Sequence, residues 1–173
     1  RQPAALTGTV GIKPTYGRVP SHPASSFTVL SHHGPLTRTV GDAAIMMNVI
    51  SSPDPRDHLA WNAPAADYTS DLENGVKGLR IGYSRTLGYI QNLDPEIGRV
   101  VDDAVRVFSD AGALVEEIDP GFSDPYDILE AMWFAGSSVA AKEFSSQQRA
   151  ELDPGFRAVL EAAANDKDRQ VRN

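Results

Sequence analysis

The sequence predicts an α/β fold, in which strands and helices alternate along the chain. Three observations support this prediction: strand-like segments at residues 78–83 and 113–118, an amphipathic helix between them, and glycine or proline at most boundaries. The chain has 173 residues, of which 41% are hydrophobic and 23% charged, as is ordinary for globular proteins. A chain of this length is long enough to bury a core.

Glycine and proline recur throughout the first third of the chain, which favours turns and loops. Residues 1–5 have the residue types of a turn, and residues 10–13 form the one strand-like segment there. Residues 21–31 are polar and show no hydrophobic period. We expect them to form a loop, either at the surface or lining a site.

A first helix is predicted to begin near Thr39. Thr39 and Asp42 have the spacing of a capping arrangement, in which side-chain oxygens satisfy free backbone N–H groups. Apolar side chains then recur at helical spacing, at Ala43, Met46, Met47 and Ile50. The SPDP run at residues 52–55 ends this helix, and residues 56–78 are predicted to be irregular.

The clearest helix in the sequence follows Asp94. Asp94 is the expected N-cap, and Pro95 occupies the first helical position, where its missing N–H has no cost. An apolar stripe follows, at Ile97, Val100, Val101, Ala104, Val105 and Phe108. Gly112 is predicted to end the helix, and the two strand-like segments flank it.

Two more helices are expected in the last third of the chain. One begins at Pro125 and runs to about Phe144, and another follows Asp153 and Pro154. Residues 166–173 are predicted to be the polar tail of a helix.

Composition excludes several classes of function. The net charge of −7 argues against a nucleic-acid binder. The absence of cysteine excludes disulfides, cysteine-ligated metals and thiol nucleophiles, and it favours a reducing compartment, so we expect a cytoplasmic protein. The sequence contains no run of 18 apolar residues, so no membrane span is predicted. The first five residues do not have the pattern of a signal peptide.

Local motifs do not indicate a self-contained active site. His32 and His33 are adjacent and point to opposite faces of an extended segment, so no metal site is predicted. The GTVG run at residues 8–11 precedes a strand, whereas a phosphate loop follows one. Ser137 and Ser138 lie within a predicted helix, not on the sharp turn of a nucleophile elbow.

Longer segments resemble the amidase signature family. The run TGTVGIKPTYGR at residues 7–18 is similar to the family's G-x-x-G-x-K-P-T-x-G-R, and GPLTRTVGDAA at residues 34–44 is similar to G-P-[LMI]-[TA]-R-[ST]-V-x-D-A-A. PDPRD at residues 53–57 matches the end of its G-x-D-P-R-D turn, with serine where glycine is common. The resemblance covers nearly the whole chain, and the segments occur in the family's order.

The resemblance implies an α/β/α fold with a mixed sheet flanked by helices. It also implies hydrolysis of carboxylic amides to the acid and ammonia or an amine by a Ser–cis-Ser–Lys triad, without metal or organic cofactor. Placed on this sequence, the nucleophilic serine is expected two residues before Arg1, with the other two triad residues farther upstream. We therefore expect residues 1–173 to be a partial domain, truncated at both ends, that has no catalytic residue of its own.

Supporting roles are implied for five residues that belong to the matched segments. Arg1 is expected to hold the nucleophile turn, and Pro3 and Thr7 to rigidify the backbone that leaves it. Arg38 and Asp42 stand four residues apart and are expected to pair across a helix start.

Substrate-binding candidates come from two segments. Trp133 and Phe134 on the third predicted helix, and His33 at the end of a loop at residues 21–33, are expected to line a substrate funnel. The alternative for the two aromatic residues is a place in the core, which is usual for aromatic side chains on helices.

Three interpretations of function remain open from the sequence. The first is a stand-alone amidase that acts on a small-molecule amide, with a homodimer of the parent protein as the candidate assembly and with no nucleic acid or membrane partner. The second is the A subunit of a tRNA-dependent glutamine amidotransferase, which the opening RQPAA also suits. The third is a non-catalytic structural or interaction fragment.

Overall fold

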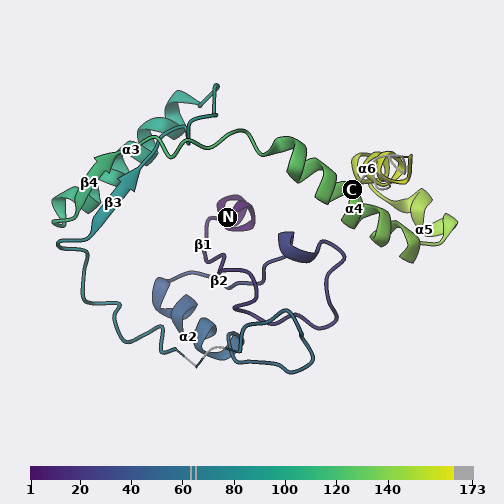
Figure 1. Ribbon diagram of the computed structural model, residues 1–173, viewed down its shortest axis with the longest axis horizontal. Coiled ribbons are helices and arrows are strands. Elements are labelled where there is room, and N and C mark those ends of the chain that lie inside the picture. The colour runs from purple at the N-terminus through teal and green to yellow at the C-terminus, as the bar shows by residue number, and fades with distance from the viewer. Residues whose placement is uncertain (63, 65, 166–173) are drawn as a thin grey trace. The chain divides into compact units, whose positions relative to one another are not determined.

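The computed structural model describes residues 1–62, 64 and 66–165 and confirms the α/β class (Figure 1). The chain divides into two compact units. The first consists of Arg1–Ser70 together with the chain from Ile128 onward, and the second consists of Asp71–Asp127. Each unit is described by itself.

The first unit begins with a short helix and a two-stranded antiparallel sheet. Its first five elements are α1 (Gln2–Thr7), β1 (Val10–Gly11), the 3₁₀ helix η1 (Thr28–Leu30), β2 (Leu36–Thr37) and α2 (Val40–Ile50). Val10 pairs with Thr37 and Gly11 with Leu36. The core here is built from small side chains, and its buried apolar residues are Ala4, Ala43, Ala44 and Met47.

The prediction of a turn at residues 1–5 is wrong, because this segment begins α1. Pro3 lies in the first turn of the helix, where a missing N–H is tolerated. Gly8 ends the helix in the left-handed conformation, at φ 63°. A Cβ on Gly11 would lie 2.6 Å from the Cβ of Ala4, so glycine is needed where β1 passes this helix.

The predicted start of α2 is confirmed. The Thr39 side chain accepts a hydrogen bond from the Asp42 backbone N–H at 3.1 Å, as an N-cap does. The helix ends at Ile50, just before the SPDP run.

The second unit contains a β-α-β arrangement. Its elements are β3 (Arg80–Tyr83), α3 (Pro95–Asp110) and β4 (Leu114–Glu117). The two strands are parallel, with Arg80 beside Leu114 and Tyr83 beside Glu117. As predicted, Asp94 caps α3, and Gly112 follows it with a φ of 90°.

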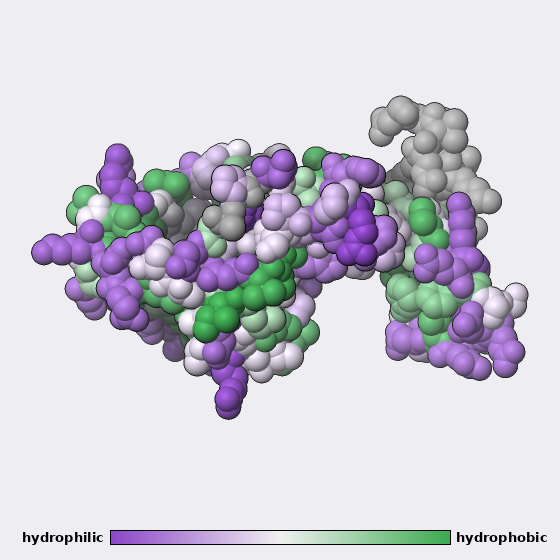
Figure 2. Space-filling model, turned by 90° about the horizontal axis from the view of Figure 1, so that it is seen from below, coloured by the Kyte–Doolittle hydropathy of each residue, from purple (hydrophilic) through white to green (hydrophobic). Residues whose placement is uncertain are grey.

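The apolar stripe of α3 faces solvent to a large extent. Four of its larger side chains are between 42% and 63% exposed, and they are Ile97, Val100, Val101 and Phe108, while Val105 is partly buried. Apolar surface, coloured green, is also open on the face of the molecule that Figure 2 presents. An amphipathic helix is normally stabilised by burying this stripe. The sequence pattern therefore specifies a helix whose apolar packing surface is only partly buried in this structure.

The C-terminal region is helical. It comprises α4 (Tyr126–Ala140), the 3₁₀ helix η2 (Ala141–Glu143), α5 (Ser146–Glu151) and α6 (Pro154–Asn165). The helix predicted from Pro125 to Phe144 thus becomes α4 and η2. The short helix α5 was not predicted, although Ser145 and Gln148 form a capping box at its start. The polar tail predicted at residues 166–173 lies outside the described residues.

Candidate functional site

Arg1, Pro3 and Thr7 lie at the two ends of α1. Thr7 Oγ1 donates a hydrogen bond to the Pro3 carbonyl oxygen at 2.7 Å and lies 2.8 Å from Thr9 Oγ1. These contacts tie the last turn of the helix to its first turn. Arg1 and Pro3 also line an open groove of about 240 Å³, together with Lys13 and His32. The structure therefore places two of the predicted supporting residues on one groove.

Arg38 and Asp42 do not form an ion pair, although both are described residues. Both are exposed, and the backbone of Asp42 is bound by the Thr39 cap instead. Arg38 precedes the extended N-cap residue Thr39 and so lies outside the helix, where the i, i+4 spacing does not bring its side chain beside Asp42.

A small pocket lies between the 21–33 loop and residues from two other segments. Its volume is about 60 Å³, and its walls include Tyr16, Ser21, His32, His33 and Asp57. A space of this size has room for a few water molecules, whereas pockets that bind drug-sized ligands measure roughly 300–1,000 Å³. The pocket alone is too small for a whole amide substrate with a bulky substituent.

His32 separates this pocket from the groove beside Arg1, since it lines both. Its ring meets the Tyr16 ring edge-on, with 5.7 Å between centroids. Its Nδ1 lies 3.3 Å from the Leu30 carbonyl oxygen, which only accepts, so Nδ1 is the donor. His33, the candidate from the sequence, is exposed and lines the pocket.

Trp133 on α4 contacts the middle of the 21–33 loop. The rings of Phe27 and Trp133 lie 4.9 Å apart, with 40° between their planes. Gly136 makes room for Phe27, because a Cβ there would lie 2.5 Å from its ring. Trp133 remains 46% exposed, and Phe134 is partly buried. The two segments named from the sequence thus meet, through a phenylalanine that was not among the predicted site residues.

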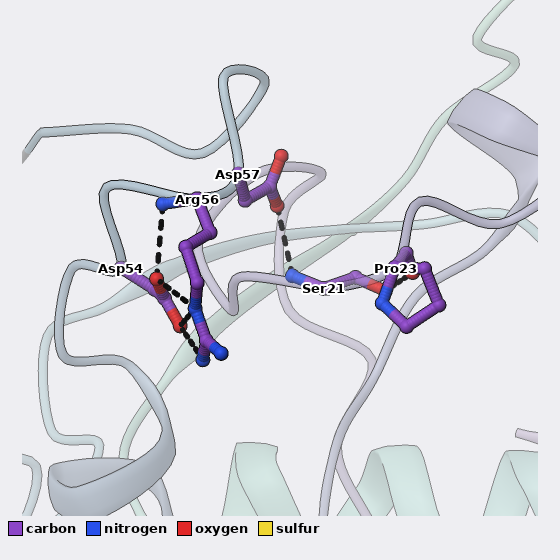
Figure 3. A network of polar contacts seen from close by, with 5 residues as sticks. All are labelled: Ser21, Pro23, Asp54, Arg56 and Asp57. Atoms are coloured by element: carbon purple, nitrogen blue, oxygen red, sulfur yellow. Dashed lines mark hydrogen bonds and ion pairs between the residues drawn. The ribbon is translucent and has the colours of Figure 1, made fainter.

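The turn at residues 53–57 contacts the start of the same loop. The Asp57 carboxylate accepts a hydrogen bond from the backbone N–H of Ser21 at 2.8 Å (Figure 3). It accepts a second one from the backbone N–H of Leu59 at 2.9 Å. These backbone bonds lower the pKa of the Asp57 carboxyl, with the Ser21 bond contributing most. In the sequence this turn is visible only as a family motif, which does not predict its contact with Ser21.

Asp54 is engaged differently from Asp57. Its carboxylate forms a two-point ion pair with the side chain of Arg56, with Nη2 2.6 Å from Oδ2 and Nε 3.0 Å from Oδ1. The Arg56 side chain therefore holds the pKa of the Asp54 carboxyl well below its usual range. Figure 3 shows that Asp54 and Arg56 form a closed pair beside the bond from Asp57 to Ser21.

A second set of polar contacts involves Trp61 and Tyr68. Arg18 Nε donates to Tyr68 Oη at 2.6 Å, and the Asn48 side chain accepts from the Tyr68 backbone N–H at 2.7 Å. The Trp61 backbone N–H donates to the Gly17 carbonyl oxygen at 2.8 Å. These bonds hold Trp61 and Tyr68 against the N-terminal part of the unit.

The part of the chain that the structure describes contains neither a cluster of metal-binding side chains nor a membrane-spanning helix. In it, no three or more histidine, aspartate or glutamate side chains gather at metal-binding distance. None of its helices has both the length and the apolar composition needed to cross a membrane. Ser137 lies within α4 with its side chain fully buried, in keeping with the predicted structural role and not with a reactive nucleophile.

Comparison with known proteins gives a consistent result. The family profile described as Amidase matches residues 1–172. An acylamidase of Rhodococcus erythropolis is 36% identical over 172 residues, which cover 94% of this chain and 35% of that protein. The A subunit of glutamyl-tRNA(Gln) amidotransferase from Myxococcus xanthus is 45% identical over 119 residues, which cover 68% of this chain and 24% of that protein.

The solved structures that resemble this chain include the same two kinds of protein. A bacterial aryl acylamidase, described as one of the amidase signature enzymes, superposes with a TM-score of 0.78 at 31% identity, covering 95% of this chain and 36% of its own. The A subunit of glutamyl-tRNA(Gln) amidotransferase from Thermotoga maritima superposes with a TM-score of 0.65 at 27% identity. The match covers 98% of this chain and 38% of that protein. The chain thus spans about a quarter to a third of the length of the curated relatives it matches.

Proposed function

This chain belongs to the amidase signature family, and on that premise we propose that it is part of an enzyme that hydrolyses carboxylic amides. The observation that carries the proposal is the family match over residues 1–172, with motifs in the family's order. The nucleophilic serine is expected two residues before Arg1, and the rest of the Ser–cis-Ser–Lys triad farther upstream. The residues of this chain then support and line the site and do not attack the amide.

A stand-alone amidase is the interpretation that the comparisons favour. The match to the acylamidase extends over 94% of the chain, against 68% for the amidotransferase protein of Myxococcus xanthus, and the aryl acylamidase also superposes better. The partly exposed Trp133 beside Phe27 suits an apolar or aromatic substituent on the amide. We therefore propose an aryl or other apolar amide as the substrate class, with Trp133, Phe134 and His33 on the substrate side.

The amidotransferase interpretation remains the second candidate, because the identity over the matched 119 residues is higher, at 45%. A protein of that kind would be expected to release ammonia from glutamine and to act with partner proteins. Amine release from an aryl amide by the protein alone would favour the first proposal over this one.

The test is an assay of the polypeptide that includes the residues upstream of Arg1. We expect amine or ammonia release from an aryl amide, and loss of this activity when the serine two positions before Arg1 is replaced by alanine. Activity that survives this replacement would contradict the placement of the nucleophile. No release from any aryl amide, aliphatic amide or glutamine would favour the non-catalytic interpretation.

A further inference from the structure

The carboxylate of Asp57 joins two segments that lie far apart in the sequence. Its Oδ2 accepts the Ser21 backbone N–H, 36 positions away, while Oδ1 accepts the N–H of Leu59 in its own turn. Hydrogen bonds to an ionised acceptor are stronger than bonds between neutral groups. The carboxylate therefore fixes the first residue of the 21–33 loop to the turn at residues 53–57.

The loop is held at two further places. In its middle, Phe27 packs against Gly136 and Trp133 on α4. At its end, His32 contacts the Tyr16 ring and the Leu30 carbonyl oxygen. Between these points regular structure is limited to the single 3₁₀ turn of η1, and Val29 is 47% exposed. The position of the loop therefore depends on few contacts. At the start of the loop, the hydrogen bond between the Ser21 N–H and Asp57 is the polar contact that holds it.

Asp57 also forms part of the wall of the 60 Å³ pocket, beside Ser21 and His33. A shift of Ser21 away from Asp57 would move this wall together with the loop. The neighbouring Asp54 provides a contrast, since both of its oxygens are hydrogen-bonded to Arg56 and its interaction with the loop is a charge attraction to His22, the smallest of the effects on its pKa.

From these contacts we propose that Asp57 is a positioning residue, which holds the 21–33 loop in the conformation that binds the apolar part of the amide substrate. The inference rests on the proposed function, in which the loop and α4 line the substrate funnel. Asp57 acts through Ser21 and the loop and does not contact the reacting atoms. Its replacement should weaken binding of substrates that reach Phe27 and Trp133, and it should spare the chemical step.

The experiment compares Asp57→Asn with the matched control Asp54→Asn in the protein that includes the upstream residues. Asparagine keeps the size of aspartate but places an NH₂ group against one of the two backbone donors. For an aryl amide, we expect KM to rise roughly tenfold in Asp57→Asn while kcat changes less than about twofold. For a short aliphatic amide, which does not reach the aromatic pair, KM should stay unchanged. Asp54→Asn should match the parent protein with both substrates.

A second readout does not depend on turnover. Hydrogen exchange of the amides in residues 21–33 should be faster in Asp57→Asn than in Asp54→Asn, with the amides of α2 equally protected in both. If Asp57→Asn does not fold, Asp57→Glu is the second variant, because it keeps the charge but moves the carboxylate relative to the Ser21 N–H, and it should produce the same selective rise in KM.

Three results would overturn the inference. One is equal KM values for the aryl amide in the Asp57 and Asp54 variants. Another is a fall in kcat that is the same for both substrates, which marks a general structural effect. The third is unchanged exchange in residues 21–33. An inactive parent protein would instead refute the proposed function itself, and with it the premise of this inference.

Discussion

At the scale of single residues, Ser137 is the side chain least suited to its surroundings. Its hydroxyl is fully buried and has no hydrogen-bond partner among the described residues. A buried hydroxyl without a partner costs about 1–3 kcal/mol. We expect Ser137→Ala to raise the free energy of unfolding by about 1–2 kcal/mol, as measured by urea denaturation, and to leave amide hydrolysis unchanged.

Ser138→Ala is the matched control for this prediction. Both serines lie in α4, so alanine improves helix propensity equally, but Ser138 Oγ donates to the Ala135 carbonyl oxygen at 2.8 Å. The gain in stability should therefore be smaller in Ser138→Ala. A loss of activity in Ser137→Ala would show that its hydroxyl has a role that the fold does not reveal.

Asp54 and Asp57 of the 53–57 turn should make the stability of the fold depend on pH in the acidic range. Folding lowers the pKa of both Asp54 and Asp57, so their carboxylates stabilise the fold above the unfolded-state pKa, near 3.9. This contribution is lost as the pH falls through the lower folded-state values. In an NMR titration, the Ser21 amide signal should show a step with a midpoint below about 3.9.

Asp57→Asn should abolish the titration step at the Ser21 amide, because asparagine does not ionise in this range. A midpoint at or above 3.9 in the parent protein would mean that the bond between Asp57 and Ser21 does not stabilise the carboxylate in solution.

At the scale of elements, the cap of α3 should have a measurable effect. Asp94 Oδ1 accepts from the Glu96 N–H at 2.7 Å and from the Ile97 N–H at 3.4 Å. Asp94→Ala leaves these donors without a side-chain partner and should lower the free energy of unfolding by about 1 kcal/mol in a denaturant titration. Asp94→Asn retains a capping oxygen and should lose much less. Equal losses in the two variants would contradict the capping role.

The contact between α4 and the 21–33 loop depends on Gly136. A Cβ there would lie 2.5 Å from the Phe27 ring, so Gly136→Ala must displace the loop. Overpacking costs about 1–3 kcal/mol, while alanine gains about 1 kcal/mol of helix propensity. We expect a net loss of stability of up to about 2 kcal/mol and a higher KM for an aryl amide.

Gly41→Ala in α2 is the control for this change, since its Cβ would meet nothing closer than Thr39 Oγ1 at 3.9 Å. This variant should be as stable as the parent protein or more stable, with unchanged KM. A Gly136→Ala protein that is stabilised to the same degree would show that the loop is not packed against α4 as described.

Elements with strong local signals could be predicted from the sequence. The caps at Thr39 and Asp94 and the glycine after α3 were all found, because capping depends on residues within a few positions. The helix at α1 was missed because proline was interpreted as a turn signal, although proline is equally suited to a first helical turn.

The candidate site could be predicted only in part. The resemblance implied a supporting role for Arg1 and Pro3 and a substrate-lining role for the 21–33 loop, but the partner of each side chain depends on contacts between distant positions. Asp57 with Ser21, and Phe27 with Trp133, leave no periodic or short-range signal in the sequence. The expected pair of Arg38 and Asp42 had a helical spacing, but Arg38 precedes the N-cap and lies outside α2.

At the scale of the whole molecule, the second unit has a sheet of two parallel strands and a helix whose stripe is largely open. Parallel sheets are normally covered on both faces and have more strands than this. Leu79, Leu114, Ile118 and Phe122 add to the exposed apolar surface of the unit. Exposed apolar faces and open strand edges favour association over a stable monomer.

Residues 1–173 expressed alone should therefore be poorly stable. We expect a broad thermal transition and strong binding of a hydrophobic dye, because the apolar stripe of α3 has little to pack against. Val100 is 63% exposed in this stripe, so Val100→Lys should reduce aggregation of the isolated chain. In a longer polypeptide that includes the upstream residues, the same substitution should lower the melting temperature if the stripe becomes covered there. A sharp, reversible transition of the 173-residue chain would contradict this expectation and show that the two units are stable without any further covering.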